Sequence, residues 1–314
     1  AIYTGNGTAI GSGGLTITND GNSDLKPDWI WHKKRGGSES GAFADSSRGT
    51  HKGIFPNEAN AESSGGSQYV NSFNTDGFTV GNVGWANDNS QTYVAWQWKA
   101  NGGTTSSNSD GSITTTVQAN TTAGFSIVTH TGNATNGATI GHGLGVVPQV
   151  IIKKNRSDSS PEWNVYHHSI GNTKSLFLNT TDAATTESAY NNTSPTSSIQ
   201  TINGSNANNG DGDNMVVYFF TPIKGYSKFG TYEANNSTDG PFVYTGFQPA
   251  WVMVKSVDAT GNWFIMDSTR SDINVSNEIL FANWNAAEDT SNAIDFLSNG
   301  FKLRNSGSGG LNYQ

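Results

Sequence analysis

The sequence predicts an all-β fold made of tandem antiparallel β-sandwiches. β-Branched and aromatic residues gather in runs of four to eight, and clusters of Gly, Asn, Asp and Ser separate these runs. No window of the sequence keeps a 3.6-residue apolar period over three turns, which argues against long amphipathic helices. The same order of residues also recurs three times along the chain, which indicates tandem domains.

In each repeat, a proline introduces an apolar stretch, and a lysine stands six positions after the proline. A second apolar stretch follows, and then the pattern [Ile/Leu]-Phe-x-Asn at 54–57, 176–179 and 280–283. The proline–lysine pairs are Pro27 and Lys33, Pro148 and Lys154, and Pro249 and Lys255. This register predicts three β-sandwich repeats, at 1–108, 109–224 and 225–314, arranged as beads with a core in each.

The second repeat shows the expected strands most clearly. Seven runs flanked by turn residues lie at 125–131, 138–141, 150–154, 163–167, 175–178, 198–202 and 215–220. The pairs Asp76-Gly77 and Asn299-Gly300 predict tight hairpins in the other two repeats. This strand spacing favours a jelly roll like the concanavalin-type lectin sandwich, with an immunoglobulin-like topology as the alternative.

The two junctions differ, and both ends of the sequence look incomplete. Residues 102–110 are nearly all Gly, Ser, Thr and Asn, which predicts a flexible joint, whereas the second and third repeats meet near 222–226 almost without a linker. The third repeat lacks the apolar run that ends the others at 93–98 and 215–220, so its sheet would have an exposed edge. We therefore expect a piece of a longer polypeptide, with the third repeat incomplete at its C-terminus.

Composition excludes several classes of function. The sequence has no cysteine, so disulfides and thiolate metal sites are impossible. Charged residues make up 13% of it, and its net charge is −8 with no basic run, so we expect no nucleic-acid partner. Apolar runs are far shorter than a membrane span requires, and we expect no membrane insertion.

Further repeated motifs carry a family resemblance. They include 124–126 and 225–227, which lie 101 positions apart like Pro148 and Pro249, and the segments 45–49, 93–100, 123–128, 141–144, 225–230 and 240–247. Together these motifs resemble a repeat domain of bacteriophage virion proteins, particularly phages of marine bacteria, found in tail-fibre-like or uncharacterised structural proteins. The resemblance covers most of the chain. It implies a structural part of a virion that could contact the host, and no catalytic motif accompanies it.

Two short acidic–basic motifs are the main candidates for catalysis. Asp45 and Arg48 in the first repeat match Asp267 and Arg270 in the third, with hydroxyl residues between them. A catalytic triad would need a histidine between carboxylate and hydroxyl, so we interpret the motifs as ion pairs or turn caps at strand ends. No two glutamates are singled out as the pair that a glycosidase needs. We predict no catalytic residue.

Histidines and oxygen-rich loops are the candidates for metal binding. His167 and His168 are adjacent, so on a strand they would point to opposite faces, and His130 and His142 show no zinc spacing. Loops 87–89 and 211–214 contain the oxygen ligands that calcium prefers, but Asx and Gly are also ordinary turn residues. We predict no metal and no cofactor, and calcium is the alternative for these two loops.

The nine tryptophans fall into two groups. Most lie at repeat-aligned strand positions, where alternation places pairs on one face, and we assign them to the sandwich cores. These are Trp29, Trp31, Trp96, Trp98, Trp163, Trp251 and Trp263. Trp85 and Trp284 stand in polar loops that differ between repeats, and so does Tyr190. Loop aromatics stack on sugars, so these three are the predicted binding residues. The alternatives are a tryptophan ring folded back over a sandwich end and packing between subunits.

We therefore expect a non-enzymatic structural component of a phage virion, in a tail fibre or similar appendage. Its partners would be other virion proteins and copies of itself, with a trimer as the form common among such fibres, and a host surface glycan as a candidate ligand. Two alternatives are open. One is a polysaccharide depolymerase or carbohydrate-binding segment of a tail spike, and the other is a capsid-decorating or head-fibre protein.

Overall fold

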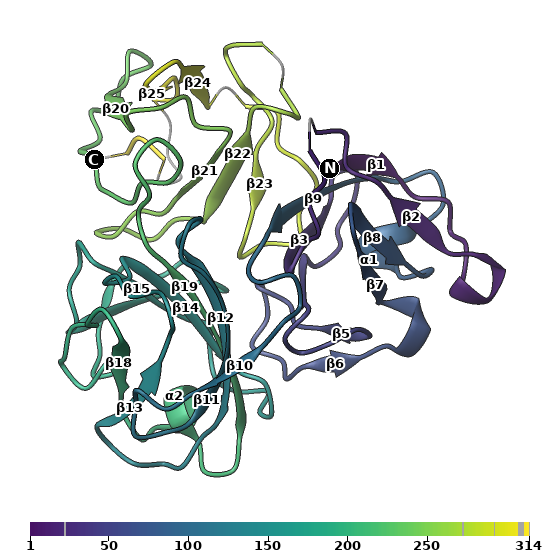
Figure 1. Ribbon diagram of the computed structural model, residues 1–314. Coiled ribbons are helices and arrows are strands. Elements are labelled where there is room, and N and C mark those ends of the chain that lie inside the picture. The colour runs from purple at the N-terminus through teal and green to yellow at the C-terminus, as the bar shows by residue number, and fades with distance from the viewer. Residues whose placement is uncertain (22, 272, 292, 307–310, 314) are drawn as a thin grey trace.

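The computed structural model describes the chain except for residues 22, 272, 292, 307–310 and 314. Its described residues form antiparallel sheets with two four-residue α-helices, α1 (Gly84–Asn87) and α2 (Asn206–Asn209). This confirms the predicted all-β sandwich fold. Figure 1 shows three lobes gathered around a common centre. We call the lobes formed by the three repeats the first, second and third units.

The first unit is a sandwich of two sheets. One has the order β1 (Ile2–Thr4), β9 (Thr92–Trp98), β3 (Trp29–Lys34) and β4 (Ala42–Asp45). The other has the order β2 (Leu15–Ile17), β8 (Gly77–Val80) and β7 (Val70–Asn74), and β5 (Lys52–Gly53) pairs separately with β6 (Ser63–Ser64). Short 3-10 turns, η1 (Ile10–Ser12) and η2 (Gly66–Gln68), lie in the connections. Residues from both sheets, such as Ile30 and Phe78, form the core between them.

The second unit has an eight-stranded sheet. Its order is β10 (Ser106–Asn108), β11 (Thr115–Asn120), β12 (Phe125–Thr131), β19 (Asn214–Phe220), β14 (Val150–Asn155), β15 (Asn164–His167), β16 (Lys174–Phe177) and β17 (Thr185–Thr186). A second sheet of β13 (Ala138–Gly141) and β18 (Ile199–Ile202) covers one face. Each of the seven predicted strands is present, with bounds within one residue of those expected. The expected flexible joint at 102–110 is wrong in part, because β10 lies in it and pairs with β11.

The third unit has two three-stranded sheets. One has the order β20 (Phe242–Tyr244), β25 (Gly300–Leu303) and β24 (Ile294–Leu297), and the other β21 (Trp251–Val254), β22 (Phe264–Asp267) and β23 (Leu280–Phe281). In the other units a central strand, β9 or β19, pairs with β3 or β14. Among the described residues β21 pairs with β22 alone, so the edge that the sequence predicted is open.

The units do not behave as separate beads, because one apolar core joins all three. Trp29 and Trp31 from the first unit, Trp163 from the second and Trp263 from the third belong to a single cluster of buried side chains. Neighbouring positions on the same strand, such as Ile30, face the sandwich interior instead. The repeat-aligned tryptophans thus fill a core shared between units, and their assignment to individual sandwich cores was wrong. A strand that is buried on both faces can contribute side chains to two cores at once. Every residue of β3 is buried.

The repeated lysines link the units in a cycle. Lys154 of the second unit donates to the carbonyl of Ala59 in the first at 2.7 Å, and Lys255 of the third donates to Thr181 in the second at 3.2 Å. Lys33 of the first unit donates to Trp284 in the third at 2.6 Å, which closes the cycle. Each acceptor lies just after an [Ile/Leu]-Phe-x-Asn motif, so the two parts of the sequence register meet across the unit boundaries.

Backbone hydrogen bonds repeat the same cycle. The amide of Glu62 donates to Arg156, the amide of Ala184 to Val257, and the amide of Glu288 to Arg35, at 2.8–2.9 Å. The indole nitrogens of Trp163 and Trp263 also donate to the carbonyls of Phe55 and Phe177, each in the preceding unit. The three units therefore form a closed ring with approximate threefold symmetry, built by a single chain.

Candidate functional site: an ion network between the units

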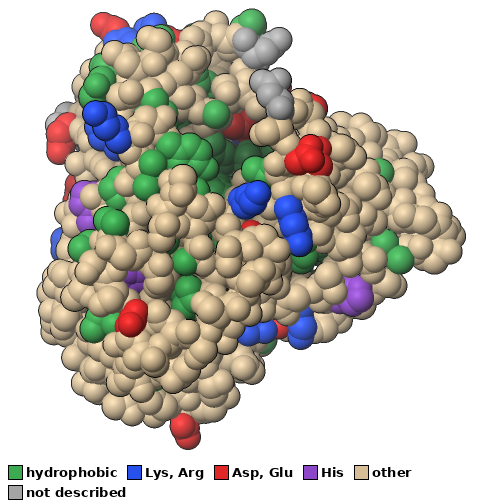
Figure 2. Space-filling model, viewed as in Figure 1, with side chains coloured by type: hydrophobic (Ala, Val, Ile, Leu, Met, Phe, Trp, Pro, Cys, Tyr) green, Lys and Arg blue, Asp and Glu red, His purple; other side chains and the backbone are tan. Residues whose placement is uncertain are grey.

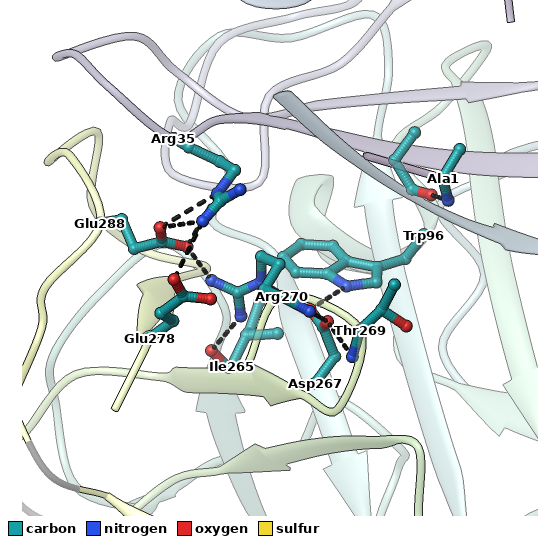
Figure 3. Close-up of polar contacts among 10 residues, drawn as sticks. Ala1, Arg35, Trp96, Ile265, Asp267, Thr269, Arg270, Glu278 and Glu288 are labelled. Carbon is teal, nitrogen blue, oxygen red and sulfur yellow. Dashed lines mark hydrogen bonds and ion pairs between the residues drawn. The ribbon is translucent and has the colours of Figure 1, made fainter. Parts of the chain in front are cut away.

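The boundary between the third and first units contains a network of charged side chains (Figure 3). Arg35, which follows β3, donates from Nη2 to Glu288 at 2.7 Å and to Glu278 at 3.2 Å. Glu288 also accepts from Arg270, so one carboxylate lies between two guanidinium groups from different units. Arg270 in turn donates from Nε to Asp267 at 2.6 Å, and the side chain of Arg270 is fully buried.

An aromatic strand residue completes this network from the first unit. The indole nitrogen of Trp96, on β9, donates to the Oδ2 atom of Asp267 at 2.9 Å. The guanidinium carbon of Arg270 lies 5.6 Å from the ring of Trp96, within cation–π range. Asp267 is therefore held by a cation of its own unit and by a donor of another unit.

The boundary between the first and second units repeats the arrangement. Arg48 donates to Asp45 at 2.5 Å, and Glu62 lies between Arg48 and Arg156, accepting from each at 2.8 Å. The hydroxyl of Tyr218, on β19, donates to Asp45 at 2.7 Å, where the other boundary has an indole. These contacts confirm the interpretation of Asp45 with Arg48, and of Asp267 with Arg270, as ion pairs at strand ends. The sequence did not reveal that both pairs extend across a unit boundary.

The charges of the two networks shift the pKa values of two carboxyl groups, Glu62 and Glu278. Burial alone would raise the pKa of Glu62, but hydrogen bonds and charges from Arg156 and Arg48 outweigh it and lower that pKa to about 2. Burial and the nearby charge of Glu288 raise the pKa of Glu278, and Arg35 and Arg270 oppose them. The first carboxyl is fixed as an anion by its partners, which suits a structural tie between units rather than proton transfer.

The loops proposed as calcium ligands use their oxygens internally. Asp213 accepts from the side-chain amide of Asn155 at 2.7 Å, and Asn87 accepts from the backbone amide of Asn6 at 2.8 Å. Across the part of the chain that the structure describes, no group of three or more His, Asp or Glu side chains could hold a metal ion. In each loop, at least one side-chain oxygen is thus engaged by a donor from elsewhere in the chain.

Adjacent His167 and His168 were expected on opposite faces of a strand, and this is wrong. β15 ends at His167, so the backbone turns there and the two ring centroids lie 4.9 Å apart. The Nδ1 atom of His167 is hydrogen-bonded to the hydroxyl of Ser169 at 2.6 Å. This place in the second unit corresponds to Asp45 and Asp267, so the second unit has no equivalent carboxylate to join the network.

A model of a family described as "Domain of unknown function (DUF7483)" matches residues 1–313. The chain belongs to this family. The match runs through all three units, which suits a fold whose units share one core. No curated protein and no solved structure matches the chain. Within the described residues, no helix is both long and apolar enough to span a membrane.

The three predicted binding aromatics of this DUF7483 chain lie in different environments. Trp85 is only 5% exposed, on α1, where it packs against His32 and Tyr69. Tyr190 is 1% exposed and packs against Tyr166 inside the second unit. Buried rings cannot stack on a ligand from solution. Both rings fold inwards, which for Trp85 is the alternative that the sequence left open.

Trp284 is the one predicted binding residue at the surface. Its side chain is 50% exposed, and its ring lies 5.4 Å from that of Phe281. Its carbonyl accepts from Lys33, so the loop is fixed at the boundary between the third and first units. The structure therefore brings none of the three predicted residues together. The sequence could not distinguish the two buried aromatics from the exposed one, because a short polar loop has the same composition whether its aromatic side chain points inwards or outwards.

Proposed function

We propose that this chain is a rigid, non-enzymatic structural segment of a phage virion, in a tail fibre or similar appendage. The observation that carries the structural part is the closed ring of three units around one core. Contacts between domains of one chain are usually small and polar, so relative motion is the default. Here large aromatic side chains and buried ion pairs join the units, which favours a single rigid body. The virion part rests on the resemblance of the repeated motifs.

The chemistry of the charged residues supports a non-enzymatic function. Asp45, Asp267, Glu62 and Glu288 are all engaged by arginines. A shallow pocket of about 200 Å³ lies at the ends of β11, β12 and β19. Threonines, His130, Arg156 and Asn214 line it, without a carboxylate or a platform of Phe, Tyr or Trp. A glycosidase needs two carboxylates at its site, and this pocket offers none.

The surface supports assembly with other virion proteins and with copies of the chain. On the face that Figure 2 shows, charged side chains are scattered, and hydrophobic side chains gather where Figure 1 places β21. An open strand edge is a template for pairing with another chain unless something covers it. The exposed ring of Trp284 supports contact with a host glycan, since half-exposed aromatics are suited to stacking on sugars.

Labelling of purified phage particles tests this proposal. Antibodies against the recombinant chain should decorate the tail or an appendage in electron micrographs, and mass spectrometry should find its peptides in the particles. Particles that lack the chain would overturn the virion proposal. Decoration of the head would favour a capsid-decorating or head-fibre protein instead. Release of oligosaccharides from host polysaccharide by the purified chain would favour the depolymerase alternative.

A further inference from the structure

The sandwich of the second unit contains a buried lysine directly opposite a buried asparagine. Lys153 on β14 pairs in antiparallel register with Asn164 on β15, and the two residues are 2% and 1% exposed. Directly paired residues point to the same face of a sheet. The next residues on that face, Ile151 and Tyr166, belong to the core of this unit. The amine of Lys153 and the amide of Asn164 therefore share one dry compartment.

The amine is available for chemistry. Within the described residues, Nζ of Lys153 has no hydrogen-bond partner, and it lies 5.3 Å from the ring centroid of Tyr190. Burial lowers the pKa of Lys153 to about 7, although the charge of Glu187 opposes this effect. A large fraction of the amine is thus uncharged at neutral pH, and an uncharged amine is a nucleophile.

The hydrogen-bond partners of the Asn164 side-chain amide favour nucleophilic attack on its carbonyl carbon. Its Oδ1 atom accepts from the hydroxyls of Tyr190 and Ser175, the second at 3.4 Å. Two hydroxyl donors aimed at one carbonyl oxygen can stabilise the negative charge that forms when the carbon is attacked. The Nδ2 atom donates to the carboxylate of Glu187 at 3.0 Å, so a proton acceptor lies beside the group that would leave.

The other units show that the fold does not require this polar set. The equivalent strand pair is His32 with Ala42 in the first unit and Val254 with Phe264 in the third. The third unit fills both positions with apolar side chains. A buried lysine without a partner costs stability, so its presence only in the second unit indicates a use beyond packing.

We propose that Lys153 and Asn164 form an intramolecular isopeptide bond after the chain folds. Nζ attacks Cγ of Asn164, and the new Nζ–Cγ bond forms while Oδ1 takes up negative charge beside Tyr190 and Ser175. Glu187 accepts a proton from Nζ and passes it to Nδ2. The Cγ–Nδ2 bond then breaks and ammonia leaves, so the reaction needs no oxidant, metal or cofactor.

Rotation of the lysine brings the reacting atoms together. The Cβ atoms of directly paired residues are about 4.5–5.5 Å apart, and the four-carbon stem of lysine spans that separation. No hydrogen bond restrains Nζ among the described residues, so its rotation breaks none. The product is a neutral secondary amide, which removes the buried amine and links β14 to β15 covalently.

The intact mass of the purified full-length chain tests the proposal. We expect the wild-type mass to be lower than the sequence mass by one ammonia. After trypsin digestion, the peptide 157–174 should be joined to a peptide that ends at Lys154 and is uncut after Lys153. The Lys153→Met and Asn164→Ala variants should have their full sequence masses. Lys174→Met, at an exposed position on β16, is the matched control and should still lose ammonia.

The Glu187→Gln variant distinguishes a failure of bond formation from a failure of folding. It keeps the shape of the side chain but removes the proton acceptor, so we expect a folded protein that retains its ammonia. A wild-type chain with the full sequence mass, and with normal cleavage after Lys153, would overturn the proposal. So would a Lys153→Met variant that still loses ammonia. These outcomes do not depend on whether the chain belongs to a virion.

Discussion

The hydroxyl of Tyr218 donates a hydrogen bond to the buried carboxylate of Asp45 at 2.7 Å, although the two residues are 173 positions apart. The indole of Trp96 makes the equivalent bond to Asp267 at 2.9 Å. Both bonds run from the central strand of one unit to the strand-end carboxylate of another. The association of the units is therefore fixed by directional bonds as well as by the shared apolar core.

Removal of the hydroxyl from Tyr218 should weaken the boundary between the first and second units. Tyr218→Phe keeps the buried ring and deletes one donor to a charged acceptor, which typically costs about 1–3 kcal/mol. Urea unfolding of the full chain measures this loss. Tyr226→Phe is the matched control, because Tyr226 is 59% exposed, and it should leave the unfolding midpoint unchanged.

Neutralisation of Glu62 should have a larger effect. Glu62→Gln leaves Arg48 and Arg156 without the carboxylate between them, and breaking a buried ion pair from one side costs about 3–5 kcal/mol. Urea unfolding again gives the free energy. Glu233→Gln, at an exposed position, should unfold like the wild type. Equal stability of the two variants would show that the network contributes nothing at this boundary.

Stability should fall as the pH drops below about 6.5, partly because of His32. Burial, and then the charge of the N-terminus, lowers the pKa of His32 from 6.5 to about 3. The unfolded chain binds a proton in this window and the folded chain does not, so stability is lost as pH falls from 6.5 towards 3. His32→Gln should reduce the slope of stability with pH by up to about 1.4 kcal/mol per pH unit. The unfolding free energies of wild type and variant at pH 8 give the cost of altered packing, because His32 is uncharged there in both states. An unchanged slope of stability with pH in the variant would contradict the contribution of His32.

Substitutions at the three predicted aromatics should separate packing from binding. Trp85→Ala removes a buried side chain and should destabilise the chain by about 3–5 kcal/mol. Trp284→Ala should cost less than about 1 kcal/mol, since half of that side chain is already exposed. On a glycan array, any glycan bound by the wild type should be lost with Trp284→Ala. Binding that survives this change would exclude stacking on Trp284.

Much of the fold within a unit could be predicted because local patterns determine it. The pair Asp76-Gly77 predicted a hairpin, and β7 and β8 meet there with Gly77 at φ 98°, a conformation that favours glycine. The strands of the second unit followed from alternating apolar runs between turn residues. β10, β11 and β17 were not predicted, because they consist mainly of polar residues such as Ser, Thr and Asn.

The arrangement of the units and the place of each aromatic could not be predicted in the same way. Both depend on contacts between distant residues, such as Lys33 with Trp284, which a strand pattern does not encode. The repeated lysine was visible in the sequence, yet its acceptor lies in another unit. Tyr190 was assigned to a surface loop because its neighbours are polar, whereas its ring packs beside the buried amine of Lys153.

Differential scanning calorimetry of the full chain tests the central claim most directly, namely that the three units form one rigid body. A shared core and a closed cycle of bonds predict one transition whose calorimetric and van't Hoff enthalpies agree, as for a two-state unit. Glu288→Gln should shift this whole transition to lower temperature, because it weakens the boundary that closes the ring. Separate transitions for the units, or a Glu288→Gln variant in which only part of the heat absorption shifts, would contradict the account.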